Sequence, residues 1–243
     1  MWGKVIRYAE VTSTNDLARD HARRGETEGT AVCAHYQTAG RGRRGREWQA
    51  PAGSSLLVSF VLRPPSYLAQ SAWLTLAGGV AAAKAAAAVS GRPVRLKWPN
   101  DLLLDGKKVG GILTETHAGA AVVGIGINVA QQADDFPTEL LSQATSLSLA
   151  AGQPVAAVEV LAALTREFEV VYTDLVRSGH DSVQRAWRQL DDTLGRVVQV
   201  QSAQETFTGQ ATDLDDQGAL WVLREDGEAH RVVAGDVSIC LGD

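Results

Sequence analysis

Residues 94–116 read VRLKWPNDLLLDGKKVGGILTET, and they predict a buried strand followed by a β-hairpin. Three short apolar runs in this stretch are expected to be strands: residues 94–98, 102–104 and 108–116. Asp105 and Gly106 stand between the second and third runs, and this pair is typical of a two-residue hairpin turn. The stretch therefore predicts neighbouring strands of one sheet.

Polar residues follow the first of these strands directly. Pro99 favours an extended or turned backbone, so Asn100 and Asp101 are expected to point out of the sheet edge. A carboxylate and an amide at such an edge are candidates for binding or proton transfer. The alternative is that Asp101 is only a turn residue.

The return strand of the hairpin combines a cation with two glycines. Gly110 and Gly111 leave a flat place on an apolar strand, where a ligand can lie on the sheet. Lys108 stands beside that surface and could neutralise an acid. The alternative is that Lys107 and Lys108 are exposed charges on a strand.

Outside the hairpin, hydrophobic periodicity predicts further strands and helices. Four more strands are expected at residues 5–11, 30–36, 54–62 and 120–129. Helices are expected from the Ser13-Thr14-Asn15 cap to Arg24, then at residues 72–89, 154–177 and 182–190. Asp16 stands three residues after Ser13, which predicts a capping box at the first helix. Residues 131–149 show no clear pattern.

The end of the chain differs from the rest. Five short runs are expected to be strands: residues 197–201, 207–212, 219–223, 230–233 and 237–240. Five strands in under fifty residues predict a small barrel. We therefore expect a domain boundary near Asp192, which separates residues 1–191 from residues 192–243.

The segment from Gln37 to Gly53 is rich in glycine and arginine and is expected to be a functional loop. Its centre reads GRGRRGREW, from Gly40 to Trp48. Four arginines in seven residues repel one another unless an anion lies among them, and arginine matches phosphate and carboxylate oxygens in pairs. Glycines let the backbone approach a ligand, and Trp48 could exclude water from it. The alternative is a solvated basic loop or a nucleic-acid tether.

A third glycine pair lies in GIGIN, residues 124–128. These glycines also flatten a buried strand, which Asn128 ends. The dinucleotide-binding motif GxGxxG is disfavoured because the third glycine and the following helix are missing.

Composition limits the function further. The 243 residues are 45% hydrophobic and 21% charged, as in a globular protein, and the net charge of −5 disfavours broad nucleic-acid binding. Cys33 and Cys240 are expected to be buried free thiols of a chain in reduced cytoplasm. The sequence begins without an apolar signal segment, and Lys84 interrupts the longest alanine-rich run, so neither export nor a membrane span is expected.

In combination, these segments resemble the biotin–protein ligases. The resemblance covers the whole chain in order: the cap at Ser13, Tyr36-Gln37 leading into GRGRRGREW, KWPNDLLLDGKKVGGILTE, GIGIN, a helical pair and the strand-rich end. It implies an α+β fold in which helices flank a mixed sheet, followed by an SH3-like C-terminal domain. It also implies an enzyme that activates biotin with ATP and Mg²⁺ to biotinyl-5′-AMP. A lysine of a biotin carboxyl carrier protein then attacks this mixed anhydride. The carrier protein is typically a part of acetyl-CoA carboxylase.

The resemblance also assigns roles to individual residues. Biotin would be bound by Ser13, Thr14, Asn15, Gln37, Arg41, Gly42, Arg43, Lys108, Gly110 and Gly111. ATP would be bound by Arg43, Arg46, Trp48, Lys97, Asn100 and Asn128. The catalytic residues would be Lys108, Arg43 and Asp101, with Asp101 or water as the base for the incoming amine. No metal site on the protein itself is implied.

The sequence departs from the family in two places. Family members often end near Ser-x-Arg, whereas this chain has Ser238-Ile239-Cys240, and the residue that covers adenine is uncertain, with Phe136 as the candidate. A helix-turn-helix does not fit before Val5, so no specific DNA binding is expected. A lipoate or octanoate ligase and a non-enzymatic biotin sensor are the alternatives; Gln37 and the arginine loop argue against the first, and the net charge against the second. The oligomeric state stays open, a homodimer included.

Overall fold

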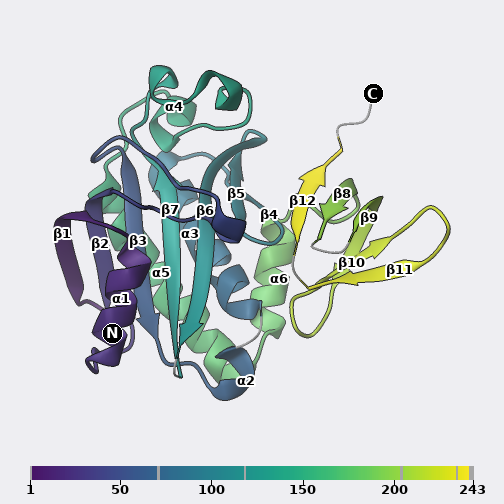
Figure 1. Ribbon diagram of the computed structural model, residues 1–243, viewed down its shortest axis with the longest axis horizontal. Helices are drawn as coiled ribbons and strands as arrows, with labels where there is room; N and C mark the ends of the chain where they lie inside the picture. Colours follow the sequence, from purple (N-terminus) through teal and green to yellow (C-terminus); the bar gives the residue numbers. More distant parts are fainter. Residues whose placement is uncertain (1, 70–71, 118, 203–204, 234, 241–243) are drawn as a thin grey trace.

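Two β-sheets organise the part of the chain that the computed structural model describes, residues 2–69, 72–117, 119–202, 205–233 and 235–240. The larger sheet has seven strands (Figure 1). Their spatial order is β1 (Val5–Val11), β2 (Ala31–Gln37), β3 (Ser55–Leu62), β7 (Ala120–Asn128), β6 (Lys107–His117), β5 (Asp101–Leu104) and β4 (Arg95–Lys97). The β1–β2 pair is parallel and all other pairs are antiparallel, so the predicted mixed sheet is confirmed.

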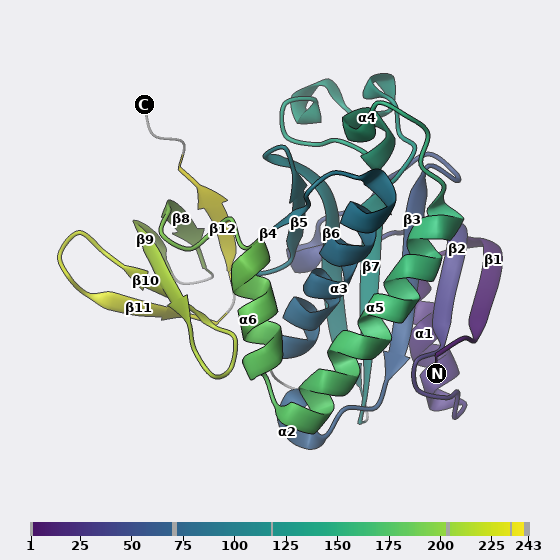
Figure 2. The same cartoon turned by 180° about the vertical axis from the view of Figure 1, so that it is seen from behind.

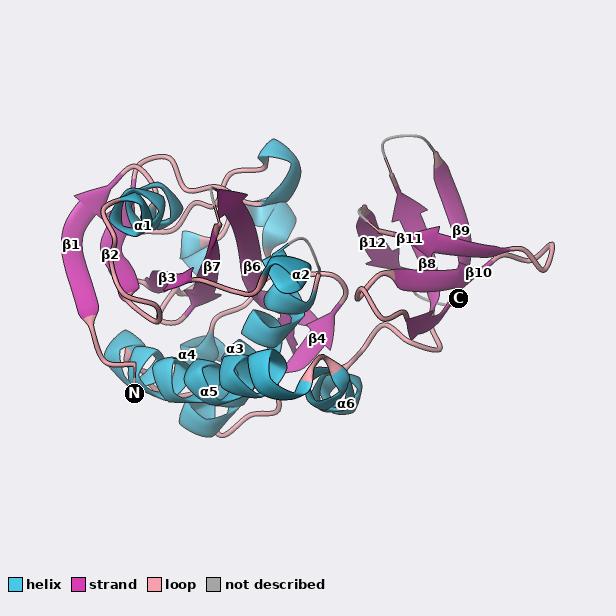
Figure 3. Cartoon of the chain, turned by 90° about the horizontal axis from the view of Figure 1, so that it is seen from below, coloured by secondary structure: helices cyan, strands magenta, loops and turns pink. Residues whose placement is uncertain are grey.

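Helices cover both faces of this sheet. Helix α1 (Thr14–Arg23) lies on one face, and α3 (Trp73–Ser90) and α5 (Ala157–Ser178) lie on the other (Figures 2 and 3). The remaining helical segments are α2 (Ser66–Ala69), α4 (Leu147–Ala151), α6 (Asp181–Leu190) and the single turns Arg43–Gly45, Ala133–Asp135 and Thr138–Leu140. The four long helices confirm the sequence prediction, whereas α2 and α4 were not expected.

Helix α3 forms the centre of the core. Its many alanines and glycines let it approach the sheet closely: a Cβ on Gly78 would lie 3.1 Å from Val123 Cγ1. The helix is long and apolar enough to cross a membrane by length and composition, and 72% of it is buried inside the fold. Gly91 ends it in the left-handed conformation that glycine favours.

The second sheet is a five-stranded antiparallel arrangement. Its order is β11 (Ala229–Val232), β10 (Leu220–Leu223), β9 (Thr206–Leu214), β8 (Val197–Gln201) and β12 (Asp236–Ile239). Buried and exposed residues alternate along β8, as expected for a sheet with one covered face. All five strands that the sequence predicts are present, which supports a small C-terminal β domain.

Trp73, at the start of α3, and Trp98, which follows β4, bind a turn of the second sheet. Trp73 Nε1 donates to Asp216 O over 2.7 Å, and Trp98 Nε1 donates to Gly218 O over 3.0 Å. Both indoles are almost fully buried, so each N–H has a partner where an unpaired donor would be costly. The domain boundary near Asp192 stays a prediction.

Two sequence expectations about local structure are wrong. Ser13 occupies the N-cap of α1, but its side chain makes no capping hydrogen bond; Gln37 Oε1 accepts from Thr14 N instead, at 2.7 Å, while the Asp16 carboxylate binds arginines. Cys33 is buried as expected, whereas Cys240 is exposed because it follows the last strand of the second sheet.

Candidate active site

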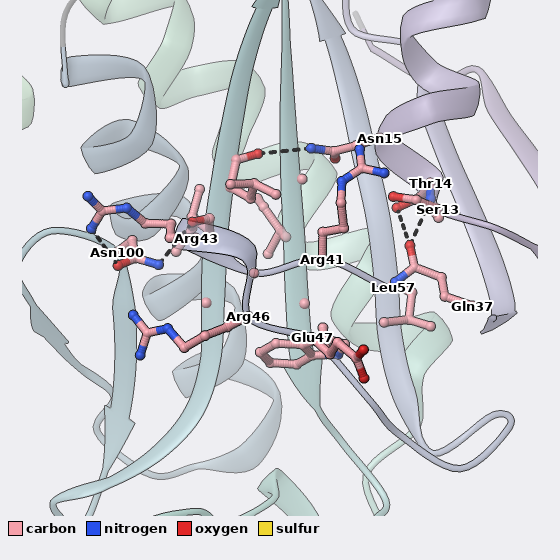
Figure 4. A pocket seen from close by; sticks show the side chains of 18 of the residues that line it. Ser13, Thr14, Asn15, Gln37, Arg41, Arg43, Arg46, Glu47, Leu57 and Asn100 are labelled. Carbon is pink, nitrogen blue, oxygen red and sulfur yellow. Dashed lines mark hydrogen bonds between the residues drawn. The ribbon is translucent and has the colours of Figure 1, made fainter. Parts of the chain in front are cut away.

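A cavity lies on the face of the large sheet that carries α1, beneath the loop of residues 40–48 (Figure 4). Its lining combines the N-terminus of α1, the arginine loop and strands β3, β6 and β7. The lining residues are Ser13, Thr14, Asn15, Gln37, Arg41, Gly42, Arg43, Arg46, Glu47, Trp48, Leu57, Asn100, Lys108, Gly111, Ile112, Leu113, Gly124, Ile125 and Gly126. Segments that are far apart in the sequence therefore form one site, as the resemblance implies.

One end of the cavity is polar and hydrogen-bonded. Gln37 Oε1 accepts from Thr14 N and from Thr14 Oγ1, the latter over 3.0 Å. The hydroxyl oxygen of Ser59, a buried residue of β3, lies 2.8 Å from Thr14 Oγ1 and 2.6 Å from Asn15 Oδ1, and its one proton can be donated to either. These contacts fix the directions of the donors and acceptors at the start of α1, which suits recognition of a small polar ring.

Glycines form the floor of the cavity because its other walls come close. A Cβ on Gly124 would lie 2.1 Å from Asn15 Oδ1, and a Cβ on Gly126 would lie 2.8 Å from the Trp48 ring. A side chain at either position would displace these residues. Trp48 lies over the strand, and its buried Nε1 has no hydrogen-bond partner in the described structure. The middle of the cavity is therefore narrow and apolar.

Lys108 is held at the cavity by the largely buried carboxylate of Asp101. Its Nζ lies 2.6 Å from Asp101 Oδ1, and Lys97 Nζ lies 3.0 Å from Asp101 Oδ2. Burial raises the pKa of Asp101, but the two ammonium groups outweigh it and hold the pKa below its usual value. Asp101 is thus ionised and pairs with two lysines. The alternative that Asp101 is only a turn residue is therefore wrong.

A β-bulge brings Lys108 and Gly111 to the same side of β6. The register between β5 and β6 shifts there, because Leu102 pairs with Gly110 while Leu103 pairs with Lys108. Without the extra residue, positions 108 and 111 would face opposite sides of the strand. A Cβ on Gly111 would lie 3.6 Å from Lys108 Cε.

Arg43 occupies the opposite end of the cavity from Gln37 (Figure 4). Its Nη1 donates to Asn100 Oδ1 at 3.2 Å, and Asn100 Nδ2 donates to Ile112 O at 3.1 Å. Burial lowers the pKa of the Arg43 guanidinium from its ordinary value. Arg43 is a partly buried cation whose only hydrogen-bond partner among the described residues is neutral, so it can bind an anionic group strongly.

All four loop arginines have partners within the protein. Arg41 binds Asp16 and Glu115, whereas Arg44 and Arg46 pair with Asp236 of the second sheet. Arg44 also donates to Gln201 O at 2.8 Å. The anions expected among the arginines are therefore supplied in part by acidic side chains of distant segments, which pair with Arg41, Arg44 and Arg46.

Four of the residues proposed from the resemblance lie outside the cavity lining: Gly110, Asp101, Lys97 and Asn128. Gly110 faces the other side of the strand, where a Cβ would lie 2.6 Å from Leu102 Cδ1. Asn128 is buried and donates to Thr145 O at 3.1 Å. Phe136 is partly exposed and also lies outside the lining. Their roles in ligand binding remain predictions.

Several lining residues were not predicted from the sequence: Glu47, Leu57, Ile112, Leu113 and Ile125. Most of them are apolar strand residues that look like any core position. Gly111, Gly124 and Gly126 were already expected to flatten their strands. Among the missed residues, only Leu113 lies two positions along a strand from one of these glycines, and residues two apart share a face.

The arrangement suits a small molecule with a polar head, an apolar middle and an anionic end. The polar wall at Thr14 and Gln37 would bind the head, and the glycine floor under Trp48 would accept the chain. Arg43 and Lys108 would hold a carboxylate and, after activation, a phosphate.

Comparison with known proteins agrees with this chemistry. The sequence profile of the biotin/lipoate A/B protein ligase family matches residues 8–131, and that of the biotin protein ligase C terminal domain matches residues 193–239. The "Bifunctional ligase/repressor BirA" of Bacillus subtilis is 36% identical, covering 98% of this chain and 74% of that protein. The "Biotin--[acetyl-CoA-carboxylase] ligase" of Mycobacterium tuberculosis is also 36% identical, covering 97% of this chain and 89% of its own length.

A solved structure has the same fold. The biotin protein ligase from Aquifex aeolicus, in complex with biotin and ATP, superposes with a TM-score of 0.84 at 29% identity and covers 98% of this chain and 99% of its own. With both sequence profiles, the cavity and the two-sheet fold in agreement, the chain belongs to the biotin protein ligase family.

Proposed function

We propose that this protein activates biotin with ATP and transfers it to a lysine of a carboxyl carrier domain. The observation that carries the proposal is a cavity that combines a hydrogen-bonded polar end, a glycine floor and a cationic end. Relatives named biotin–[acetyl-CoA-carboxylase] ligases support the choice of acceptor. The fused ureido ring of biotin fits the polar end, its alkyl chain the floor and its carboxylate the cations.

The first step joins biotin to AMP. A biotin carboxylate oxygen attacks the α-phosphorus of ATP, the bond from that phosphorus to the bridging oxygen breaks, and pyrophosphate leaves. Arg43 and Lys108 stabilise the negative charge that gathers on the α-phosphate, and their fixed positions avoid the cost of reorganising water. Mg²⁺ enters with ATP as part of the substrate and neutralises the leaving pyrophosphate.

The second step moves the acyl group. The acceptor amine attacks the carbonyl carbon of biotinyl-AMP, the carbon–oxygen bond to the phosphate breaks, and AMP leaves. Lys108 stabilises the oxyanion of the tetrahedral intermediate. Asp101 holds Lys108 from behind the cavity, and both of its oxygens already accept from lysines, so water takes the amine proton.

The test is an exchange assay followed by a transfer assay. Biotin should support ATP–pyrophosphate exchange, and addition of a carrier domain should give that domain the mass of one biotinyl group. Lipoate and octanoate should support neither reaction. Exchange with lipoate but not with biotin would reject the proposal in favour of a lipoate ligase.

A further inference from the structure

Asp16 makes a two-pronged ion pair with the arginine loop. Arg41 Nη1 donates to Asp16 Oδ2 over 2.7 Å, and Arg41 Nη2 donates to Asp16 Oδ1 over 2.9 Å. The hydrogen bond from Arg41 lowers the pKa of Asp16 and in turn raises the pKa of Arg41. The sequence pattern predicted only a capping role for Asp16, which it does not have, and Asp16 does not line the cavity.

The pair connects two opposite walls of the cavity. Asp16 lies in the first turn of α1, directly after the lining residues Ser13, Thr14 and Asn15. Arg41 lies on the loop that covers the cavity, and its side chain is among the lining residues drawn in Figure 4. The ion pair therefore spans the mouth between helix and loop.

Further contacts extend the pair into a network. Arg41 Nη2 lies 3.4 Å from Glu115 Oε2, and that oxygen accepts from Asn15 Nδ2 at 2.7 Å. Arg19 also binds Asp16, at 2.6 Å. Single exposed ion pairs contribute little to stability, but two-pronged arginine–carboxylate pairs within a network are the exception. Because these side chains are 26% to 37% exposed, the network can open and close.

We propose that Asp16 is a positioning residue that latches the arginine loop over bound biotin and biotinyl-AMP. The inference rests on the proposed function and deepens it, because it assigns the retention of ligand to a residue that does not touch it. With the latch intact, Arg41 holds the loop closed against α1. Without it, the loop opens more often and the ligand leaves faster, while the chemistry at Lys108 is unchanged.

The test measures dissociation of biotin and of biotinyl-AMP from the full chain by displacement with excess biotin. Asp16→Asn should speed dissociation of both about three- to tenfold. The rate of acyl transfer from preformed adenylate in a single turnover should stay the same. Asp16→Glu should restore slow dissociation, because it keeps a carboxylate within reach of Arg41.

Two controls separate the latch from a general effect on the helix. Asp20→Asn removes another carboxylate of α1, which pairs with Arg23 and not with the loop, and should leave dissociation at the wild-type rate. In an Arg41→Ala background, Asp16→Asn should have no further effect on dissociation, since the pair is already broken. Melting temperatures of all variants show whether α1 itself is disturbed.

Each outcome either supports or overturns the proposed role of Asp16. Dissociation that Asp16→Asn leaves unchanged, or slows, overturns the latch; slowing would mean that Asp16 competes with ligand for Arg41. An equal effect with and without Arg41 overturns it too. If the wild-type protein does not bind biotin at all, the proposed function itself fails, which is a different result from biotin binding with no effect of Asp16.

Discussion

The strand lysines and the loop arginines hold positive charge at the cavity in two different ways. Lys108 on β6 and Lys97 on β4 flank β5 and share its largely buried carboxylate, Asp101, through short ion pairs. Arg41 and Arg46 stand on a loop and pair with partly exposed carboxylates of distant segments. The strand cations have a fixed geometry that backbone hydrogen bonds enforce, whereas the loop cations can exchange one partner for another.

The difference assigns separate tasks to the two regions. Chemistry that needs a charge at one place throughout both steps suits Lys108, because a preorganised charge does not reorganise during the reaction. Admission and retention of ligand suit the arginine loop, because its ion pairs are exposed enough to break. The predictions below test this division.

Removing the strand lysine should have the largest effect. Lys108→Ala should slow both adenylation and transfer by about a hundred- to a thousandfold, since one charge serves both transition states. Single-turnover assays of each step measure this. Lys107→Ala is the matched control, because Lys107 stands next to it in β6 but donates to Leu141 O outside the cavity. Loss in only one of the two steps would contradict a shared role.

Removing the shared carboxylate should destabilise the fold. Asp101→Asn leaves two partly buried lysines without their counter-ion and should lower the free energy of unfolding by about 2–3 kcal/mol at neutral pH. Urea unfolding measures it. Asp105→Asn is the control, because Asp105 is an exposed turn residue paired with Arg92.

The same carboxylate predicts a pH dependence. The pKa of Asp101 is lower in the folded than in the unfolded protein, so its stabilisation is fully present above the unfolded value of about 3.9. It is lost as pH falls through the folded-state pKa. The stability difference between wild type and Asp101→Asn should therefore shrink below about pH 4. A difference that grows with acid would show that the pKa is raised instead.

Removing the partly buried loop arginine, Arg43, should release the intermediate. Arg43→Ala should weaken retention of biotinyl-AMP by about ten- to a hundredfold, because it deletes a charge-assisted contact. The escaped adenylate should then acylate exposed lysines of bystander proteins, which mass spectrometry detects. Arg44→Ala serves as the control, since Arg44 faces Gln201 and Asp236 and does not line the cavity.

The smallest expected effect is a difference in amide hydrogen exchange between the arginine loop and strand β6. Amides of residues 40–48 should gain protection when biotinyl-AMP binds, because the phosphate and the polar ring add partners to a glycine-rich loop. Amides of β6 should be protected in both states. Equal protection of the loop with and without ligand would mean that the arginines form a preformed cradle.

Much of the fold follows from local pattern. The strand runs, the hairpin turn at Asp105-Gly106 and the alanine-rich helix all appear in the structure within a few residues of their predicted ends. These features depend on periodicity of two or 3.6 residues and on turn chemistry, which neighbouring residues determine. The residue types of the cavity, arginine, lysine and glycine, were also visible in the sequence.

Only the tertiary structure decided which of these residues face the cavity and which partners they have. Gly110 and Gly111 are neighbouring glycines that the sequence alone does not distinguish. The strand register directs Gly110 into the core and Gly111 toward Lys108. Arg41 finds Asp16 and Glu115, and Arg46 finds Asp236, across separations that no local pattern encodes. The physical reason is that a side chain's partner depends on how distant strands and helices pack, whereas its secondary structure depends mainly on its neighbours.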